Sequence, residues 1–187
     1  SLSGVIQPEN AALAVEIMEA LGRKGFFVTE KQLRTGLFLA KWGYRFEVAA
    51  RKPYFILDGA HNEDAAKRLS ESIRFYFTNK KILYIMGMLK DKEYEKVIAH
   101  TYAYAEQIVT VTPPGQARSL SGHELAQAAS EYHPKVTEAA SLEEAVEMAY
   151  LLTQKDWVII AFGSLSYLGA LGRLIKDRSE KHDRSGK

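Results

Sequence analysis

An acidic residue and an imidazole lie three residues apart in the segment DGAHN at 58–62. The segment follows the apolar run 54–57 and precedes a stretch with helical periodicity, so it is predicted to form a strand-to-helix turn. Free N–H groups and the positive end of the helix dipole favour a phosphate or carboxylate there. The alternative is purely structural: Asp58 accepts hydrogen bonds from turn amides, Asn62 caps the helix and His61 has no role.

Two further polar residues stand next to predicted strands. Arg45 precedes the first strand, within Trp-Gly-Tyr-Arg-Phe-Glu at 42–47, and its guanidinium could bind a phosphate. An ion pair with Glu47 or with a neighbouring acid is the alternative interpretation. Ser164 lies between the apolar run 157–162 and the last predicted helix, where its hydroxyl could contact a carboxylate or only cap the helix.

Several well-known catalytic motifs are missing from the sequence. It contains no GxxxxGK[ST] loop, no HExxH pair and no GxSxG segment. The chain has no cysteine, which excludes disulfides and thiolate metal sites, and the histidines outside the DGAHN segment show no spacing typical of metal ligands. We therefore predict no metal site built by this sequence alone.

The pattern from residue 45 onward alternates between strands and helices. Continuous apolar runs such as those at 54–57, 82–86 and 157–162 are typical of strands buried on both faces. The predicted fold class is therefore α/β and doubly wound, a Rossmann-like, mainly parallel sheet with helices on both faces. Ligands of such sheets bind outside the carboxyl ends of the strands, and we expect Asp58, His61 and Ser164 to converge there.

The first 42 residues do not follow this alternation. A helix is predicted after Pro8, with Gly25 beyond its end, and a second short helix starts at Thr29. Because no strand separates them, residues 1–42 are predicted to be the remnant of another domain and a linker. Residues 43–175 form the α/β domain, and residues 176–187 form a basic tail that we expect to be disordered.

The overall composition indicates one ordinary soluble domain. The chain has 187 residues, 47% of them hydrophobic, and a net charge of +2. Residues 173–187 contain six Lys/Arg and three Asp/Glu, leaving 19 against 20 elsewhere, so no basic face for nucleic acid is predicted. No apolar stretch approaches the roughly 20 residues of a membrane helix. We expect a cytoplasmic monomer that binds neither nucleic acid nor a membrane.

Three motifs occur in an order that resembles a known enzyme family. They are ILDGAHN at 56–62, GMLKDK at 87–92 and GSLSYLG at 163–169, each after a predicted strand. They resemble the C-terminal domain of the folylpolyglutamate synthase/dihydrofolate synthase branch of the Mur ligase superfamily. The segment LSGVIQPENAALA at 2–14 is similar to the end of that family's central ATPase domain.

The resemblance implies an ATP-dependent ligase. In that family ATP phosphorylates a carboxylate of dihydropteroate or folate, and L-glutamate attacks the acyl phosphate. ATP lies between the central and C-terminal domains, and Mg²⁺ is held mainly by the ATPase domain that this chain lacks. The partners implied are therefore L-glutamate, folate or dihydropteroate, and the missing N-terminal ATPase domain.

The resemblance also implies roles for individual residues. Asn10 would hold the adenine, Arg45 the phosphates of ATP, and Asp58 the ribose or its surroundings. His61 would be catalytic and would contact the reacting phosphate and the incoming glutamate. The glutamate carboxylate would be bound by the closing motif, through Ser164 or Ser166.

Other hypotheses remain open. The family usually has Trp-Pro-Gly-Arg-x-Glu where this chain has Trp-Gly-Tyr-Arg-Phe-Glu at 42–47, so the turn before Arg45 can differ in shape. The chain could be a ligase part that is inactive alone, a free-standing nucleotide or amino-acid binding module, or the C-terminal domain of another Mur-type ligase. An exposed apolar face on residues 1–40 would favour the ligase part, and a well-packed one would favour the module.

Overall fold

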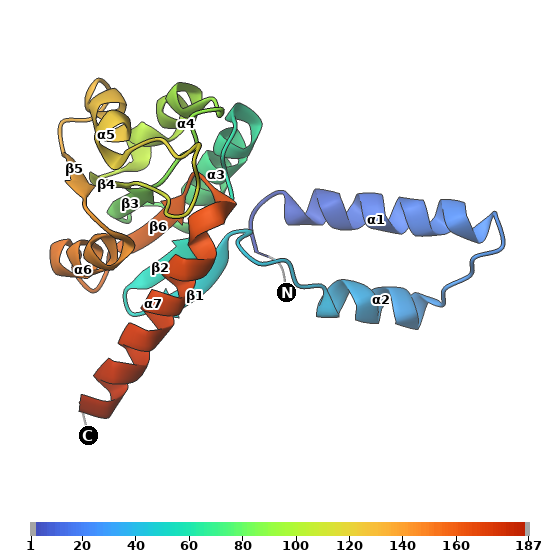
Figure 1. Ribbon diagram of the computed structural model, residues 1–187. Helices are drawn as coiled ribbons and strands as arrows, with labels where there is room; N and C mark the ends of the chain where they lie inside the picture. Colours follow the sequence, from blue (N-terminus) through green and yellow to red (C-terminus); the bar gives the residue numbers. More distant parts are fainter. Residues whose placement is uncertain (1–2, 186–187) are drawn as a thin grey trace.

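The computed structural model describes residues 3–185, and six strands form a single sheet at its centre (Figure 1). The strand order is β1-β2-β6-β3-β4-β5. The strands are β1 (Glu47–Arg51), β2 (Tyr54–Leu57), β3 (Ile82–Met86), β4 (Gln107–Val111), β5 (Val136–Ala139) and β6 (Val158–Phe162). Only the pairing of β1 with β2 is antiparallel. The predicted α/β fold with a mainly parallel sheet is confirmed.

Helices cover both faces of the sheet. They are α3 (Glu63–Tyr76), α4 (Tyr94–Thr101) and α5 (Gly122–Ser130) on one face, and α6 (Leu142–Leu152) and α7 (Leu165–Ser185) on the other. A short 3₁₀ turn (Tyr102–Tyr104) follows α4. Alternate strand residues join opposite cores: Tyr84 packs with the first group and Leu83 with the second. All five residues of β3 and of β6 are buried, which explains their continuous apolar sequences.

The first two helices project from this α/β domain. We call the segment formed by α1 (Gln7–Gly22), the loop 23–29 and α2 (Glu30–Leu39) the helical arm (Figure 1). Neither helix contains a buried residue. The large hydrophobic residues exposed on the arm are Leu13, Ile17, Phe26, Phe27, Val28, Phe38 and Leu39. The arm thus exposes apolar side chains on both helices and on the loop between them.

The C-terminal segment differs from the prediction. Helix α7 continues to Ser185, through most of the range 176–187 that was expected to be disordered. Ile175 is fully buried and anchors the helix, and Lys176 and Glu180 form an i,i+4 pair at 4.0 Å. Lysine, arginine and glutamate also have high helix propensity, so a charged segment can extend an anchored helix. None of the helices in residues 3–185 combines the length and apolarity needed to cross a bilayer.

Candidate functional site

The turn after β2 is closed by its own polar side chains. Asp58 accepts a hydrogen bond from the Ala60 amide through Oδ1 and one from the Phe46 amide through Oδ2, both at 2.9 Å. Asn62 is the N-cap of α3 and accepts from the Ala65 amide at 2.9 Å. The structural roles considered for Asp58 and Asn62 are therefore present. They do not exclude ligand binding, since each carboxylate oxygen can accept a second hydrogen bond.

His61 is oriented by the backbone of the same turn. Its Nδ1 lies 2.8 Å from the carbonyl oxygen of Gly59, and the ring is half-buried. Because a carbonyl oxygen only accepts, Nδ1 must carry the proton and Nε2 is the other functional atom. Within residues 3–185 no hydrogen bond involves Nε2. The ring therefore has a fixed tautomer and one nitrogen for a ligand.

The carboxyl group of Asp58 lies in a poorly solvated position. Burial raises its pKa from 3.8 to about 6, although the amides of Phe46 and Ala60 and the charge of Arg45 act in the opposite direction. Near neutral pH the group is mostly ionised and lies close to a cation. The site thus combines one negative and one positive side chain in a partly closed space.

Arg45 lies in an unusual loop between the helical arm and β1. Its neighbours Tyr44 and Phe46 have positive φ angles of 60° and 51°. The Gly59 amide donates to the Tyr44 carbonyl at 2.8 Å, which ties this loop to the turn after β2. The Glu47 carboxylate accepts from the Tyr44 amide at 2.8 Å, and in the described chain it forms no ion pair with Arg45. Of the acids considered as partners of Arg45, Glu47 is thus not paired with it, whereas the charge of Arg45 acts on the neighbouring Asp58.

A cavity of about 480 Å³ brings together three of the predicted residues, Asn10, Arg45 and Asp58. The Arg45 guanidinium lies 5.4 Å from the centre of the Trp42 ring, which also lines the cavity. The remaining lining residues are Ser3, Gly4, Ile6, Gln7, Phe46, Ala65, Arg68, Leu69 and Ser72. The cavity is thus formed by the start of the helical arm, the Arg45 loop and α3.

Arg68 is a cavity residue that the sequence motifs did not reveal. It contacts Glu71 at 3.2 Å and Glu9 of the helical arm at 3.9 Å. Its spacing from Ala65, by three residues, places both on one face of α3. The helical period could have identified this face, but only after α3 was known to border a cavity.

His61, Ser164 and Ser166 lie outside that cavity, on adjacent turns at the carboxyl ends of the strands. Strands β2 and β6 are parallel neighbours, and the Asp58 amide donates to the Ala161 carbonyl at 2.9 Å. The turns that follow both strands therefore lie side by side, as predicted for a shared edge.

The two serines differ in accessibility. Ser164 is 5% exposed and directly precedes α7, whereas Ser166 is exposed in the first helical turn. Their Oγ atoms lie 2.9 Å apart, and the Ser166 amide donates to Ser164 Oγ at 3.3 Å. Ser164 therefore acts as a helix cap in this structure, and Ser166 is the hydroxyl that a ligand can reach.

The third motif packs against the second at the same edge. Gly163 has a φ of +117°, and a Cβ there would lie 2.5 Å from the carbonyl oxygen of Gly87. Tyr167 is fully buried, and its hydroxyl donates to the carbonyls of Phe162 at 2.7 Å and Ile85 at 3.2 Å. The turns after β6 and β3 are therefore in close backbone contact.

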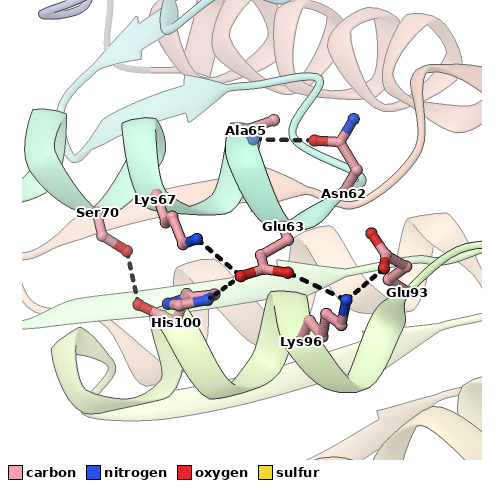
Figure 2. A network of polar contacts seen from close by, with 8 residues as sticks. All are labelled: Asn62, Glu63, Ala65, Lys67, Ser70, Glu93, Lys96 and His100. Carbon is pink, nitrogen blue, oxygen red and sulfur yellow. Dashed lines mark hydrogen bonds and ion pairs between the residues drawn. The ribbon is translucent and has the colours of Figure 1, made fainter.

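A polar network fixes the start of α3 (Figure 2). Glu63 contacts Lys67 of the same helix at 2.7 Å. It also contacts two residues of α4, Lys96 at 3.1 Å and His100 at 3.4 Å. Hydrogen bonds from Lys67, Lys96 and His100, in that order of importance, lower the pKa of Glu63 to about 2. The network joins α3 to α4 directly after the His61 turn, and sequence spacing did not identify it.

No group of three potential metal ligands from His, Cys, Asp and Glu occurs within the part of the chain that the structure describes. Three carboxylates near the site already have polar partners: Asp58 contacts two amides, Glu47 one amide, and Glu63 cations.

Comparison with known proteins agrees with this geometry. The family described as "Mur ligase, glutamate ligase domain" matches residues 44–165. A dihydrofolate synthase/folylpolyglutamate synthase from Bacillus subtilis is 36% identical over 109 residues, which are 58% of this chain and 25% of the relative. The chain therefore spans about a quarter of that curated relative.

Solved structures match over almost the whole chain. The Mycobacterium tuberculosis folylpolyglutamate synthase complexed with ADP and AMPPCP has a TM-score of 0.84 and 26% identity, covering 93% of this chain and 41% of that one. The Thermotoga maritima folylpolyglutamate synthase has a TM-score of 0.75 and 29% identity, with coverage of 94% and 39%. Because the family match includes all six strands, the first two motifs and the start of the third, the chain belongs to the Mur ligase family and contains its glutamate ligase domain.

Proposed function

We propose that this chain is the C-terminal part of an ATP-dependent ligase that adds L-glutamate to dihydropteroate or to folates through an acyl phosphate. The observation that carries the proposal is the single cavity lined by Asn10, Arg45 and Asp58, which are far apart in the sequence. The names of the relatives support the same reaction class, and the Mycobacterium tuberculosis neighbour is complexed with ADP.

The cavity has the size and side chains that a nucleotide requires. Its volume of about 480 Å³ is within the usual range for small-molecule sites. Arg45 would bind phosphate oxygens through its guanidinium, Asn10 would hydrogen-bond the adenine, and Asp58 would accept from a ribose hydroxyl with its remaining lone pairs. Trp42 orients Arg45 by contact with the ring face.

His61 would act through Nε2 on the reacting groups. In its protonated form Nε2 donates a hydrogen bond to the phosphate or the tetrahedral oxyanion, which stabilises developing negative charge. In its neutral form the same atom accepts a proton, for example from the ammonium group of glutamate before attack. The bond from Nδ1 to the Gly59 carbonyl keeps the ring orientation the same in both forms.

The serine pair would bind the glutamate carboxylate. Ser166 is exposed and would donate to the carboxylate, while Ser164 accepts from the Ser166 amide and holds the turn in place. Mg²⁺ would neutralise phosphate charge when bound. We assign it to the ATPase domain, together with the phosphate-binding loop that this sequence lacks. The chain alone is therefore expected to show no ligation.

The exposed apolar surface of the helical arm favours this proposal over a free-standing module. We assign the arm to the end of the central ATPase domain, whose remaining part would cover Ile17 and Phe38, now 51% and 74% exposed. A binding module would expose no such surface.

Kinetics on the ligase completed with its ATPase domain test the proposal. His61→Ala should lower kcat by at least about 10²-fold while the melting temperature stays unchanged. Arg45→Gln should raise KM for ATP, and Ser166→Ala should raise KM for glutamate. Arg74→Gln is a matched control, because Arg74 is exposed on α3 outside the cavity. Equal effects of Arg45→Gln and Arg74→Gln would refute the nucleotide assignment.

A further inference from the structure

A second cavity of about 480 Å³ lies beside the β1–β2 hairpin, near the amino end of β2. We call it the hairpin pocket; its lining residues are Ala49, Ala50, Arg51, Lys52, Tyr150, Arg178 and Ser179. Arg51 pairs with Tyr54, the first residue of β2, whereas Glu47 pairs with Leu57, which precedes the Asp58 turn. The pocket is therefore separated from the proposed nucleotide site by the length of a strand.

The described residues that line the hairpin pocket carry charges of one sign, although Glu147 lies beside one of them, Arg178. Arg51, Lys52 and Arg178 contribute three cations, and none of the lining residues that the structure describes is acidic. Among the side chains that the structure describes, those of residues 3–180, neither Arg51 nor Lys52 has an acidic group within 4.0 Å. Neighbouring like charges repel one another, so an anion placed between them would relieve an unfavourable interaction.

One of the three cations is held in position before any ligand arrives. The Arg178 guanidinium lies 4.4 Å from the centre of the Tyr150 ring, and its Nη1 contacts Glu147 at 3.2 Å. Tyr150 in turn packs against the buried Phe55 with ring centres 6.0 Å apart. These contacts restrict the Arg178 side chain, so less conformational entropy is lost when its remaining N–H groups bind an acceptor.

We propose that the hairpin pocket binds a small anion with two or more phosphate or carboxylate groups, at a site separate from the proposed nucleotide cavity. The cations belong to two segments, the β1–β2 hairpin and α7, and an anion with several acidic groups can contact both at once. The alanines and Tyr150 add an apolar surface for the body of such a molecule. This inference does not depend on the ligase reaction.

Calorimetry on the chain as it stands tests the proposal, with tripolyphosphate and citrate as separate probes at low ionic strength. Arg51 also lines a third cavity that contains Lys41 and Arg45, so the titrations are repeated with Arg45→Gln. We expect saturable binding that Arg45→Gln leaves intact and that Arg51→Gln with Lys52→Gln weakens at least about tenfold. Saturation by only one probe identifies a phosphate or a carboxylate ligand.

The matched control is Lys80→Gln with Lys155→Gln. Both lysines are exposed, precede β3 and β6 near the same edge, and line none of the described cavities. This double substitution removes the same charge and should change the affinity less than about twofold. An equal loss in the control would show nonspecific attraction and refute the pocket.

Amide chemical shifts of the unmodified chain locate the bound probe even if a variant fails to fold. Tripolyphosphate or citrate should shift the amides of Ala50, Tyr150 and Ser179. Shifts confined to Asn10 and Asp58, or the absence of saturable binding by either probe, would overturn the proposal.

Discussion

The helical arm and the α/β domain both form regular helices, but only the domain buries them. Thr29 and Gln32 form a complete capping box at the start of α2, and Ser121 and Glu124 form another at the start of α5. The local signals are equivalent. Helix α5 buries Leu125, whereas α2 contains no buried residue. Local sequence therefore determines where a helix begins, while its contribution to global stability depends on a packing partner.

The largest contrast is expected from removing an aromatic side chain. Phe162 is fully buried in β6 and packs edge-on against Tyr84 with ring centres 4.9 Å apart, whereas Phe38 of the arm is 74% exposed. Phe162→Ala should lower the free energy of unfolding by about 3–5 kcal/mol. Phe38→Ala should change it by less than about 0.5 kcal/mol. Urea denaturation measures both, and similar losses would mean that the arm shares the domain's core.

A glycine pair gives the next largest difference. Gly163→Ala puts an alanine at a φ of +117° and places its Cβ 2.5 Å from the Gly87 carbonyl oxygen. We expect this change to lower the free energy of unfolding by about 2–4 kcal/mol. Gly36 is in α2, where an added Cβ would meet nothing within 4 Å beyond the helix's own backbone. Gly36→Ala should instead stabilise the arm by about 0.5–1 kcal/mol through helix propensity. A thermal melt measures the loss in Gly163→Ala, and amide exchange within α2 measures the gain in Gly36→Ala. A neutral Gly163→Ala would contradict the close contact between the two turns.

The titration of Asp58 should affect only the domain. Its folded pKa of about 6 lies above the ordinary value of 3.8, so between these pH values the folded state binds more protons than the unfolded state. The free energy of unfolding therefore falls as pH rises from about 4 to 6, by at most about 3 kcal/mol from this group. Urea titrations across this range measure the slope.

Asp58→Asn provides the control for that slope. The variant should lose the pH dependence, and it should also be less stable, because an amide cannot accept hydrogen bonds at both former oxygen positions. A slope of the same size in Asp58→Asn would assign the titration to another group.

The smallest contrast concerns the two helix caps. Thr29→Ala removes the acceptor of the Gln32 amide, and Ser121→Ala removes the acceptor of the Glu124 amide. Each change should cost its helix about 1 kcal/mol. Because α5 is packed, Ser121→Ala should lower global stability, whereas Thr29→Ala should only speed amide exchange within α2. Loss of global stability in Thr29→Ala would show that the arm is coupled to the domain.

Local patterns were sufficient to predict most of the α/β domain. The buried runs of β3 and β6, the Asn62 cap and the parallel sheet all follow from periodicity and side-chain chemistry within a few residues. The shared edge of the Asp58 and Ser164 turns was also predictable, since parallel strands direct their carboxyl ends to one side.

Other features required the tertiary structure, because they join residues whose separation carries no periodic signal. The Phe46 amide donates to Asp58 in a loop where Tyr44 and Phe46 adopt positive φ angles. Positive φ angles are uncommon for residues other than glycine, so the sequence did not predict them here. The cavity with Asn10 and the contacts of Glu63 with α4 likewise depend on which helices become neighbours. The sequence by itself determined the elements and the edge where the motif turns lie. Packing decided which side chains meet there, because their contact depends on the relative placement of whole elements.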